Sequence, residues 1–261
     1  MRSFPLFLAL LFCAISFGQS TAPPVHVVNT APVITAFTNA TLHIDARTTL
    51  QKATLVVKDD LVMAAGVGVS IPAGAVVRDL QGLHIWPALI EPYSDLGLPA
   101  STPEERKAEN RAARHWNGAL RSDAHAHELF KNDMERAGKF REQGFALVIS
   151  HRMDGIARGT SAAIVLSDES PVKAVVEPDL AAHFSFRKGS STDGYPGSLT
   201  GAIALVRQAF LDAQWYASLH STTETDAVLH ALGCQLTGRL VCEASDRNDV
   251  LRWYKVMVVC E

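Results

Sequence analysis

The pattern of apolar runs along the chain changes at Leu83, and this change constrains the fold more than any other sequence feature. Between Val33 and Leu80, short apolar runs alternate with turn residues, for example at 58–60 and 72–74. Runs of this length separated by turns predict a compact antiparallel β module. Because such runs cannot bury one face alone, we expect residues 33–82 to form a β-sandwich.

From residue 83 onward, strand-like and helix-like segments alternate. The nearly continuous apolar run at 84–90 is typical of a strand buried on both faces of a parallel sheet. The polar stretch 101–141 predicts helices, and residues 145–150 predict the next strand. Apolar residues at i, i+4, i+7 and i+11 from Leu199 predict a long helix with Pro196 in its first turn.

This alternation is the pattern of a β/α barrel or an open parallel sheet. A hairpin is also predicted, from residues 163–166 and 172–176. Residues 83–261 are fewer than the roughly 200 to 250 of an eight-unit barrel. We therefore predict an α/β chain with a small N-terminal β-sandwich, followed over 83–261 by the first half of a TIM-like β/α barrel. Its four candidate strands start near His84, Phe145, Arg239 and Val256.

The N-terminus has the pattern of an export signal. Arg2 precedes an apolar run at 4–17, and a small residue, Gly18, ends it. We expect a signal peptide at 1–18 and a linker at 19–32, with a periplasmic or extracellular location. The run is shorter than the about 20 apolar residues of a membrane helix, so no stable membrane span is expected after cleavage.

Charge and cysteine content narrow the classes of partner. The formal net charge is -3, so no overall basic field attracts nucleic acid, and we expect no nucleic-acid partner. Cleavage of the signal would leave Cys234, Cys242 and Cys260, an odd set that indicates no disulfide framework. Buried thiols are the expectation for these cysteines, although Cys234 and Cys242 could pair in an oxidising compartment.

Two segments resemble a known family. Residues 38–45 and 80–91, the latter Leu-Gln-Gly-Leu-His-Ile-Trp-Pro-Ala-Leu-Ile-Glu, resemble the start of amidohydrolase-superfamily proteins, where a β-sandwich leads into the first barrel strand. Residues 155–160, Gly-Ile-Ala-Arg-Gly-Thr, are similar to a phrase of the secreted, imidazolonepropionase-like branch. The resemblance implies a divalent metal of the zinc type. It also implies metal-dependent hydrolysis of non-peptide C–N bonds in cyclic amides or amide-like molecules.

The sequence departs from this family at its metal motif. Where the family has His-x-His, with both rings on one side of a strand, this chain has Tyr93-Ser94-Asp95. Asp95 could bind a hard cation and is our candidate metal ligand, whereas Tyr93 is a poor substitute for histidine. The family's later ligands lie on strands beyond those found here. We therefore expect this chain alone to hold no stoichiometric transition metal, so whether it is an enzyme stays open.

A literal His-x-His occurs at His125-Ala126-His127, inside the stretch that predicts helices. Residues i and i+2 of a helix point about 200° apart, so these two rings are not expected to converge on one ion. We interpret them as solvent-facing.

Working residues of a β/α barrel gather at the carboxyl ends of its strands. By this rule His151 and Asp154 are the candidate catalytic residues. Arg152, Arg158 and Tyr93 are the candidate substrate-binding residues, and Glu243 and Asp246 are further donors on the rim. An ion pair between Arg152 and Asp154, with His151 hydrogen-bonded to the backbone, would explain the same residues structurally.

Two functions remain open from the sequence. The first is an exported, metal-dependent amidohydrolase acting on a small molecule. The second is a non-catalytic, degenerate amidohydrolase-like domain that is accessory to a downstream catalytic domain.

Overall fold

A computed structural model describes residues 33–59, 61–99, 115–168, 170–219 and 225–259. The predicted signal peptide, the linker and the first part, 101–114, of the stretch that predicts helices lie outside the described residues. The chain divides into two compact units, Met1–Pro87 and Ala88–Glu261, and each is described by itself. The α/β class is as expected.

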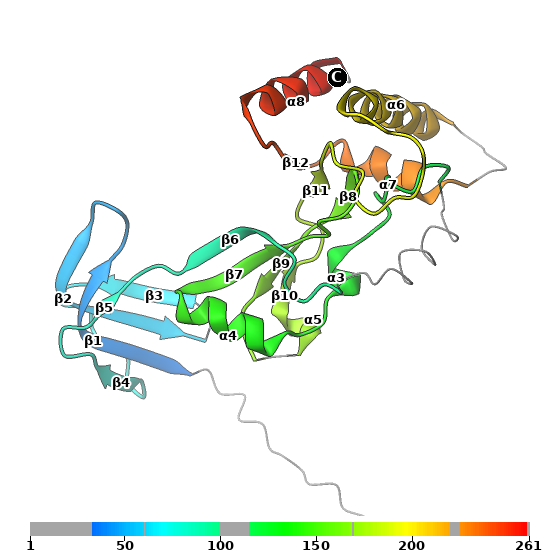
Figure 1. Cartoon of the computed structure of the whole chain (residues 1–261). Coiled ribbons are helices and arrows are strands. Elements are labelled where there is room, and N and C mark those ends of the chain that lie inside the picture. Colours follow the sequence, from blue (N-terminus) through cyan, green and yellow to red (C-terminus); the bar gives the residue numbers. More distant parts are fainter. Residues whose placement is uncertain (1–32, 60, 100–114, 169, 220–224, 260–261) are drawn as a thin grey trace, which may run out of the picture. The chain divides into compact units, whose positions relative to one another are not determined.

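The N-terminal unit contains one hydrogen-bonded sheet of five strands (Figure 1). Its strands are β1 (Ile34–His43), β2 (Thr49–Lys58), β3 (Leu61–Gly66), β4 (Val76–Asp79) and β5 (His84–Ile85). β1, β2 and β3 pair antiparallel as predicted, but β4 and β5 pair with β1 in parallel. The purely antiparallel prediction for residues 33–80 is therefore wrong for β4, because the loop after β3 returns the chain in the direction of β1. Ala40, Leu42 and Ala53 form the buried core of this sheet.

The run at 84–90 is not one buried strand. It is split between β5 and β6 (Leu89–Ser94), which belong to different units. Pro87 lies at the break, since proline cannot donate to a strand ladder. Leu89 and Ile90 are 54% and 58% exposed, so the prediction of burial on both faces is wrong.

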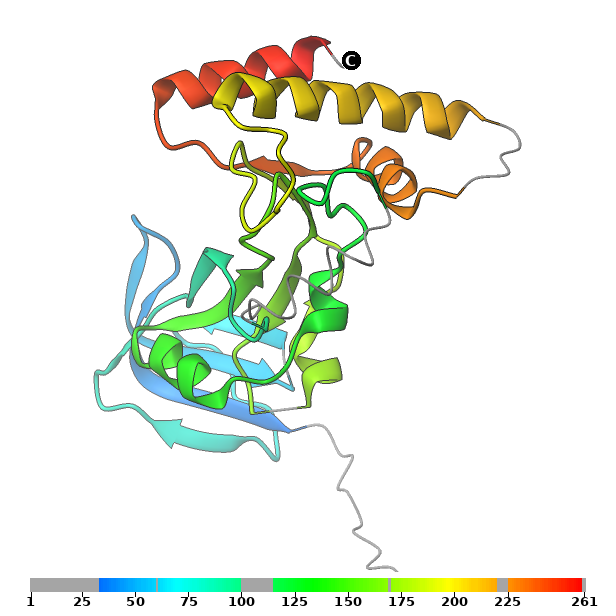
Figure 2. The same ribbon diagram turned by 45° about the vertical axis from the view of Figure 1, so that its right-hand side comes forward.

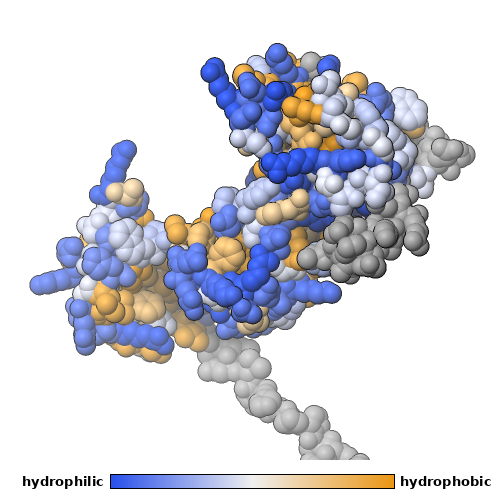
Figure 3. Space-filling view, viewed as in Figure 1, coloured by the Kyte–Doolittle hydropathy of each residue, from blue (hydrophilic) through white to orange (hydrophobic). Residues whose placement is uncertain are grey.

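β6 is the edge strand of a four-stranded sheet ordered β10-β9-β7-β6. Pro92 interrupts it without an N–H, and the backbone N–H of Tyr93 donates to a carboxylate oxygen of Glu91 at 3.0 Å. Figure 3 shows apolar side chains at the surface, and the exposed apolar residues of the described chain include Leu89 and Ile90.

The C-terminal unit contains a second sheet of three strands, ordered β12-β11-β8. β6 and β7 are parallel, as are β11 and β12, whereas the other pairs are antiparallel. The strands predicted at 145–150 and 239–243 are present as β7 and β12. The predicted hairpin is present as the antiparallel β9–β10 pair, but residues 172–174 of its predicted second strand lie in a short helix, α5 (Pro171–Ala174). The strands are β7 (Phe145–Ser150), β8 (Ala157–Thr160), β9 (Ala162–Val165), β10 (Val175–Glu177), β11 (Ala182–Phe184) and β12 (Leu240–Cys242).

Helix ends follow local capping chemistry. The Asp133 carboxylate accepts the Arg136 N–H at the start of α4, and Ser198 accepts the Gly201 N–H at the start of α6. Helix α6 therefore begins after Pro196, later than predicted. The helices are α3 (Ala126–Leu129), α4 (Met134–Glu142), α5 (Pro171–Ala174), α6 (Leu199–Ser218), α7 (Ala227–Gln235) and α8 (Arg247–Val259).

The fourth barrel strand predicted near Val256 is wrong, because that residue lies in helix α8. The Asp246 carboxylate accepts the Asp249 N–H at the start of this helix, and Trp253 and Val256 are buried one turn apart. A short apolar run does not distinguish a strand from the buried face of a helix by its period.

The main core of the C-terminal unit surrounds α6, which packs against α7 and α8 (Figure 2). Leu205, Val206 and Phe210 of α6 are 1% exposed and contact the same cluster as Phe184 and Trp253. No helix in the described part of the chain has the length and apolarity needed to cross a membrane.

The expectation of buried thiols is met only in part. Cys242 is half-buried, and burial raises the pKa of its thiol to about 12. Cys234 is exposed, and neither forms a disulfide. Cys260 lies outside the described residues.

Candidate functional site

The strand ends of the C-terminal unit bring five chemically active side chains together. β6 and β7 run parallel, so their carboxyl ends lie at one edge of the sheet, and the end of β12 contributes to the same cluster. We call this group the strand-end cluster; it consists of Tyr93, His151, Arg158, His183 and Glu243.

Two histidines form the buried part of this cluster. The rings of His151 and His183 stack with centroids 3.8 Å apart, and the edge of Tyr93 contacts His151 at 4.7 Å. Neither ring nitrogen of His151, nor Nε2 of His183, has a hydrogen-bond partner in the described structure. The backbone of His151 is held separately, because its N–H donates to the carbonyl of Ser94 at 2.9 Å. Backbone bonding of the His151 ring, one structural reading of the sequence, is therefore not observed.

Burial decides the charge of these two rings. Desolvation, with a smaller contribution from the Arg158 cation, lowers the pKa of His151 to about 4. Desolvation, followed by His151 and Arg158, lowers the pKa of His183 to about 3. Both imidazoles are consequently neutral at pH 7, and they offer buried polar atoms that the protein itself leaves unpaired.

A charged network borders the histidines. Arg158 is 3% exposed, and its guanidinium pairs with Glu243 at 2.7 Å and donates to the Tyr93 hydroxyl at 3.0 Å. The Tyr93 hydroxyl in turn donates to Glu243 at 2.9 Å. Partial burial would raise the pKa of Glu243, but Tyr93 and Arg158 together lower it below its usual value. The carboxylate is thus ionised and already neutralised by a buried cation.

The strand-end cluster does not fit the zinc-type metal that the resemblance implies. Such a site needs three or four donors at about 2.0 to 2.3 Å from one ion. Glu243 is bound by Arg158 and Tyr93, and the Asp95 carboxylate pairs with Arg136 at 2.7 Å near the surface. No group of three potential ligand atoms gathers here in the described residues.

The sequence-predicted residues fall into two sets. Tyr93, His151 and Arg158 lie together in the strand-end cluster. Asp154 does not join them in their hydrogen-bond network, because it accepts hydrogen bonds from the backbone and hydroxyl of Ser190. Arg152 lies two residues before Asp154 in the loop that follows β7 and is half-buried.

The sequence did not identify His183 as a candidate, and it indicated Glu243 only as a further donor on the rim of the barrel. A usable signal for His183 existed: the short run 182–186 alternates apolar and polar residues between two polar turns. This run contains β11, whose strand character places His183 opposite Val241 of β12.

The prediction that His125 and His127 point apart is wrong. Helix α3 begins only at Ala126, and His125 has extended backbone angles of φ -114° and ψ 120°. Both rings reach Asp179, with Nδ1 of His125 at 2.8 Å and Nδ1 of His127 at 3.7 Å from Oδ1. The helical rotation of about 100° per residue does not apply across a helix start.

The fold has a counterpart among solved structures, although no protein-family model and no curated protein matches the sequence. An amidohydrolase from Thermotoga maritima MSB8 superimposes with a TM-score of 0.69 at 17% identity, over 86% of this chain and 62% of that one. The chain thus spans about three fifths of the length of that structure, whose fold it shares. The fold that the resemblance implies is therefore the fold that this chain shares with that structure.

Two further structures overlap less well. Another amidohydrolase has a TM-score of 0.42 at 16% identity, over 87% of this chain and 59% of the other. A prolidase complexed with N-methylphosphonate-L-proline has a TM-score of 0.40 at 13% identity, with the same coverage.

Proposed function

We propose, on the premise of this shared fold, that the chain belongs to an exported hydrolase that cleaves a non-peptide C–N bond in a small cyclic amide or amide-like molecule. The sequence of residues 1–18 supports export, and residues 155–160 support the secreted branch. We also propose that the N-terminal sheet corresponds to the family's β-sandwich. In the same proposal, β6, β7, β11 and β12 correspond to the first barrel strands.

The observation that carries the proposal is the neutral, buried His151–His183 pair. Amide hydrolysis needs a group that takes a proton from the attacking water and returns one to the leaving nitrogen. A free imidazole nitrogen at a strand end can perform this transfer. A pKa of about 4 makes His151 a weak base in the free chain, but negative charge developing on a bound amide beside it would raise that pKa.

Tyr93 and Arg158 have complementary roles in this proposal. Tyr93 is 41% exposed, so its ring and hydroxyl can contact a small molecule. Arg158 is buried and is a positioning residue, because its hydrogen bond to Tyr93 and its ion pair with Glu243 hold the Tyr93 side chain in place. The metal that the family would use finds no ligand set in the strand-end cluster, so no step at this cluster is assigned to a metal.

The experiment is a hydrolysis assay on the full chain. Five- and six-membered lactams, cyclic imides and hydantoins would be incubated with the protein, with and without added Zn²⁺ or Mn²⁺, and ring-opened products measured by mass spectrometry. We expect turnover of one ring class, lost in His151→Phe and retained in His230→Phe, a control at an exposed histidine. Circular dichroism would verify that both variants fold. Absence of turnover across all substrates and metals would defeat the proposal.

One observation favours a second function. The buried Arg158 cation already neutralises Glu243, which is the arrangement of a structural network rather than of a vacant metal site. The chain would then be a non-catalytic domain that supports a downstream catalytic one. This alternative predicts no turnover by the chain alone, and turnover when any downstream segment encoded by the same gene is co-expressed and co-purifies with it.

A further inference from the structure

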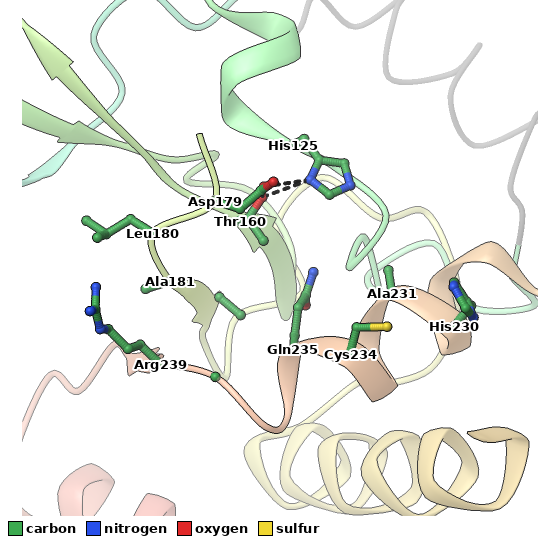
Figure 4. A pocket seen from close by; sticks show the side chains of 12 residues that line it. His125, Thr160, Asp179, Leu180, Ala181, His230, Ala231, Cys234, Gln235 and Arg239 are labelled. Carbon is green, nitrogen blue, oxygen red and sulfur yellow. Dashed lines mark hydrogen bonds and ion pairs between the residues drawn. The ribbon is translucent and has the colours of Figure 1, made fainter. Parts of the chain in front are cut away.

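We propose that His125, His127 and Asp179 bind one divalent transition-metal ion of the zinc type. His125 and Asp179 line a pocket of about 430 Å³ (Figure 4). This site is separate from the strand-end cluster and does not depend on the proposed hydrolysis. It departs from the expectation, drawn from the sequence, that the chain alone holds no stoichiometric transition metal. Its ligands come from the start of helix α3 and from the loop between β10 and β11.

The donor set has the right chemistry and spacing. One ligand atom from each of the three residues lies within 4.8 Å of the other two. Two donors bound to one zinc ion at about 2.1 Å are roughly 3.4 Å apart in a tetrahedral arrangement. Nδ1 of His125 lies 2.8 Å from Asp179 Oδ1, somewhat below this value, and a ring nitrogen of His127 belongs to the same group. Small side-chain rotations therefore suffice to close the group around an ion.

The backbone holds these ligands in place. Residues 125 and 160 form a β-bridge, and the Thr160 N–H donates to the carbonyl of Ala124 at 2.9 Å. This close approach depends on Gly159, since a Cβ there would lie 1.9 Å from the Ala124 carbonyl oxygen. The ligand segments are thus fixed to each other before any ion binds, which lowers the entropy lost on binding.

Hydrogen bonds around the group resemble an outer coordination shell. The Thr160 hydroxyl donates to Asp179 Oδ1, and Nδ1 of His127 contacts the carbonyl of Pro178 at 3.1 Å. Metal-binding histidines commonly donate their second ring N–H to a backbone carbonyl in this way, which leaves the other nitrogen free to bind the ion. Asp179 is oriented by Thr160 in the same manner.

The pocket gives the ion an open side. His125, Thr160 and Asp179 line one wall, and His230, Cys234 and Gln235 of helix α7 line the opposite wall (Figure 4). Three protein ligands beside an open cavity are typical of zinc sites that bind water or a small ligand in the fourth position. Without a metal, the 2.8 Å contact between His125 and Asp179 is an ordinary hydrogen bond, and this simpler arrangement is what the experiment must exclude.

The test is metal binding by the full chain carrying no histidine tag. After dialysis against a chelator, the protein would be titrated with ZnCl₂ by calorimetry and with CoCl₂ by visible absorption. We expect one ion per chain. The visible absorption bands should be those of Co²⁺ bound with a low coordination number. His127→Ala should weaken zinc affinity at least tenfold, whereas His230→Ala, at an exposed histidine of the same pocket, should leave the affinity unchanged.

A third variant, Asp179→Asn, should also lose zinc, but it alters the hydrogen bonds of Thr160 and His125 and could unfold the loop. His127→Ala is therefore the deciding variant, with folding checked by circular dichroism in the presence of chelator. The proposal is overturned if wild type binds no zinc in a 1:1 ratio, or if His127→Ala binds as tightly as wild type. Equal weakening by His230→Ala would likewise overturn it, by showing dispersed binding to surface histidines. None of these readouts depends on hydrolysis, so failure here leaves the proposed function standing.

Discussion

Acidification from pH 7 to pH 5 is expected to destabilise the C-terminal unit through His151 and His183. Both rings are almost fully buried, at 0% and 2% exposure, and burial lowers their pKa values to about 4 and about 3. In the unfolded chain both would titrate near the usual 6.5. Between pH 6.5 and pH 4 the unfolded state therefore binds more protons than the native state, and stability falls as pH falls.

The size of the loss follows from these pKa values. For one histidine that is half-protonated at pH 6.5 when unfolded and stays neutral when folded, moving from pH 7 to pH 5 costs about 2 kcal/mol. The two rings together set an upper bound of about 4 kcal/mol. The lowered carboxyl pKa values, such as that of Glu243, act mainly below pH 5, because their usual values are 3.8 to 4.5.

Urea unfolding followed by tryptophan fluorescence would measure this loss. Trp253 is 4% exposed and stacks on Phe186 at 4.0 Å, whereas Trp86, Trp116 and Trp215 are all more than 60% exposed. The main fluorescence change thus reports the C-terminal unit. The free energy of unfolding should be lower at pH 5 than at pH 7 by about 2 to 4 kcal/mol.

A paired variant separates this effect from general acid sensitivity. The double variant His151→Phe with His183→Phe keeps two stacked rings but removes both titrating groups, so its stability should be nearly equal at pH 5 and pH 7. Each single variant should lose about half of the pH dependence, which keeps the test informative if the double variant does not fold. Equal stability of the wild type at both pH values would refute the reasoning, as would an unchanged pH slope in the double variant.

Three further substitutions test the packing by urea or thermal unfolding. Gly159→Ala should cost about 3 kcal/mol or more, because φ is +78° and the new methyl would meet the backbone of Ala124; a neutral result would show that the two segments can separate. Phe210→Ala should cost about 3 to 5 kcal/mol, since the ring is 1% exposed in the core, and a loss under 1 kcal/mol would contradict its central place. Asp133→Ala should cost about 1 kcal/mol by removing the cap of α4, whereas Lys139→Ala, on the exposed face of that helix, should change stability by less than half of this value.

Local sequence patterns were sufficient to predict the elements whose structure does not depend on distant contacts. The strand at 145–150 follows from its apolar run, and helix α4 ends just before Gly144, which has a φ of +90°. The choice between strand and helix for the run that starts at Val256 depended on a distant partner, because Val256 packs into the cluster around α6. The five apolar residues 256–260 alone do not indicate that Val256 packs against α6.

The candidate site shows the same division. His151 directly follows strand β7, as the apolar run predicted, whereas the direction of Asp154 was set by a loop and by Ser190, 36 residues later in the chain. His125 and His127 were misjudged because the prediction placed both inside a helix that starts between them. One residue of error at a helix boundary thus changes whether two rings can converge.

The edge strand β6 has a consequence for how the protein associates with itself. An exposed edge with apolar side chains usually offers a template for intermolecular β-pairing. Here Pro92 has no N–H and the N–H of Tyr93 already donates to Glu91, so two consecutive residues cannot donate a backbone hydrogen bond to an incoming strand. Since the N–H of Leu89 also donates to the carbonyl of Gly144, few donors of β6 remain for an incoming strand. Concentrated samples should therefore form small, reversible oligomers through this edge rather than extended fibrils.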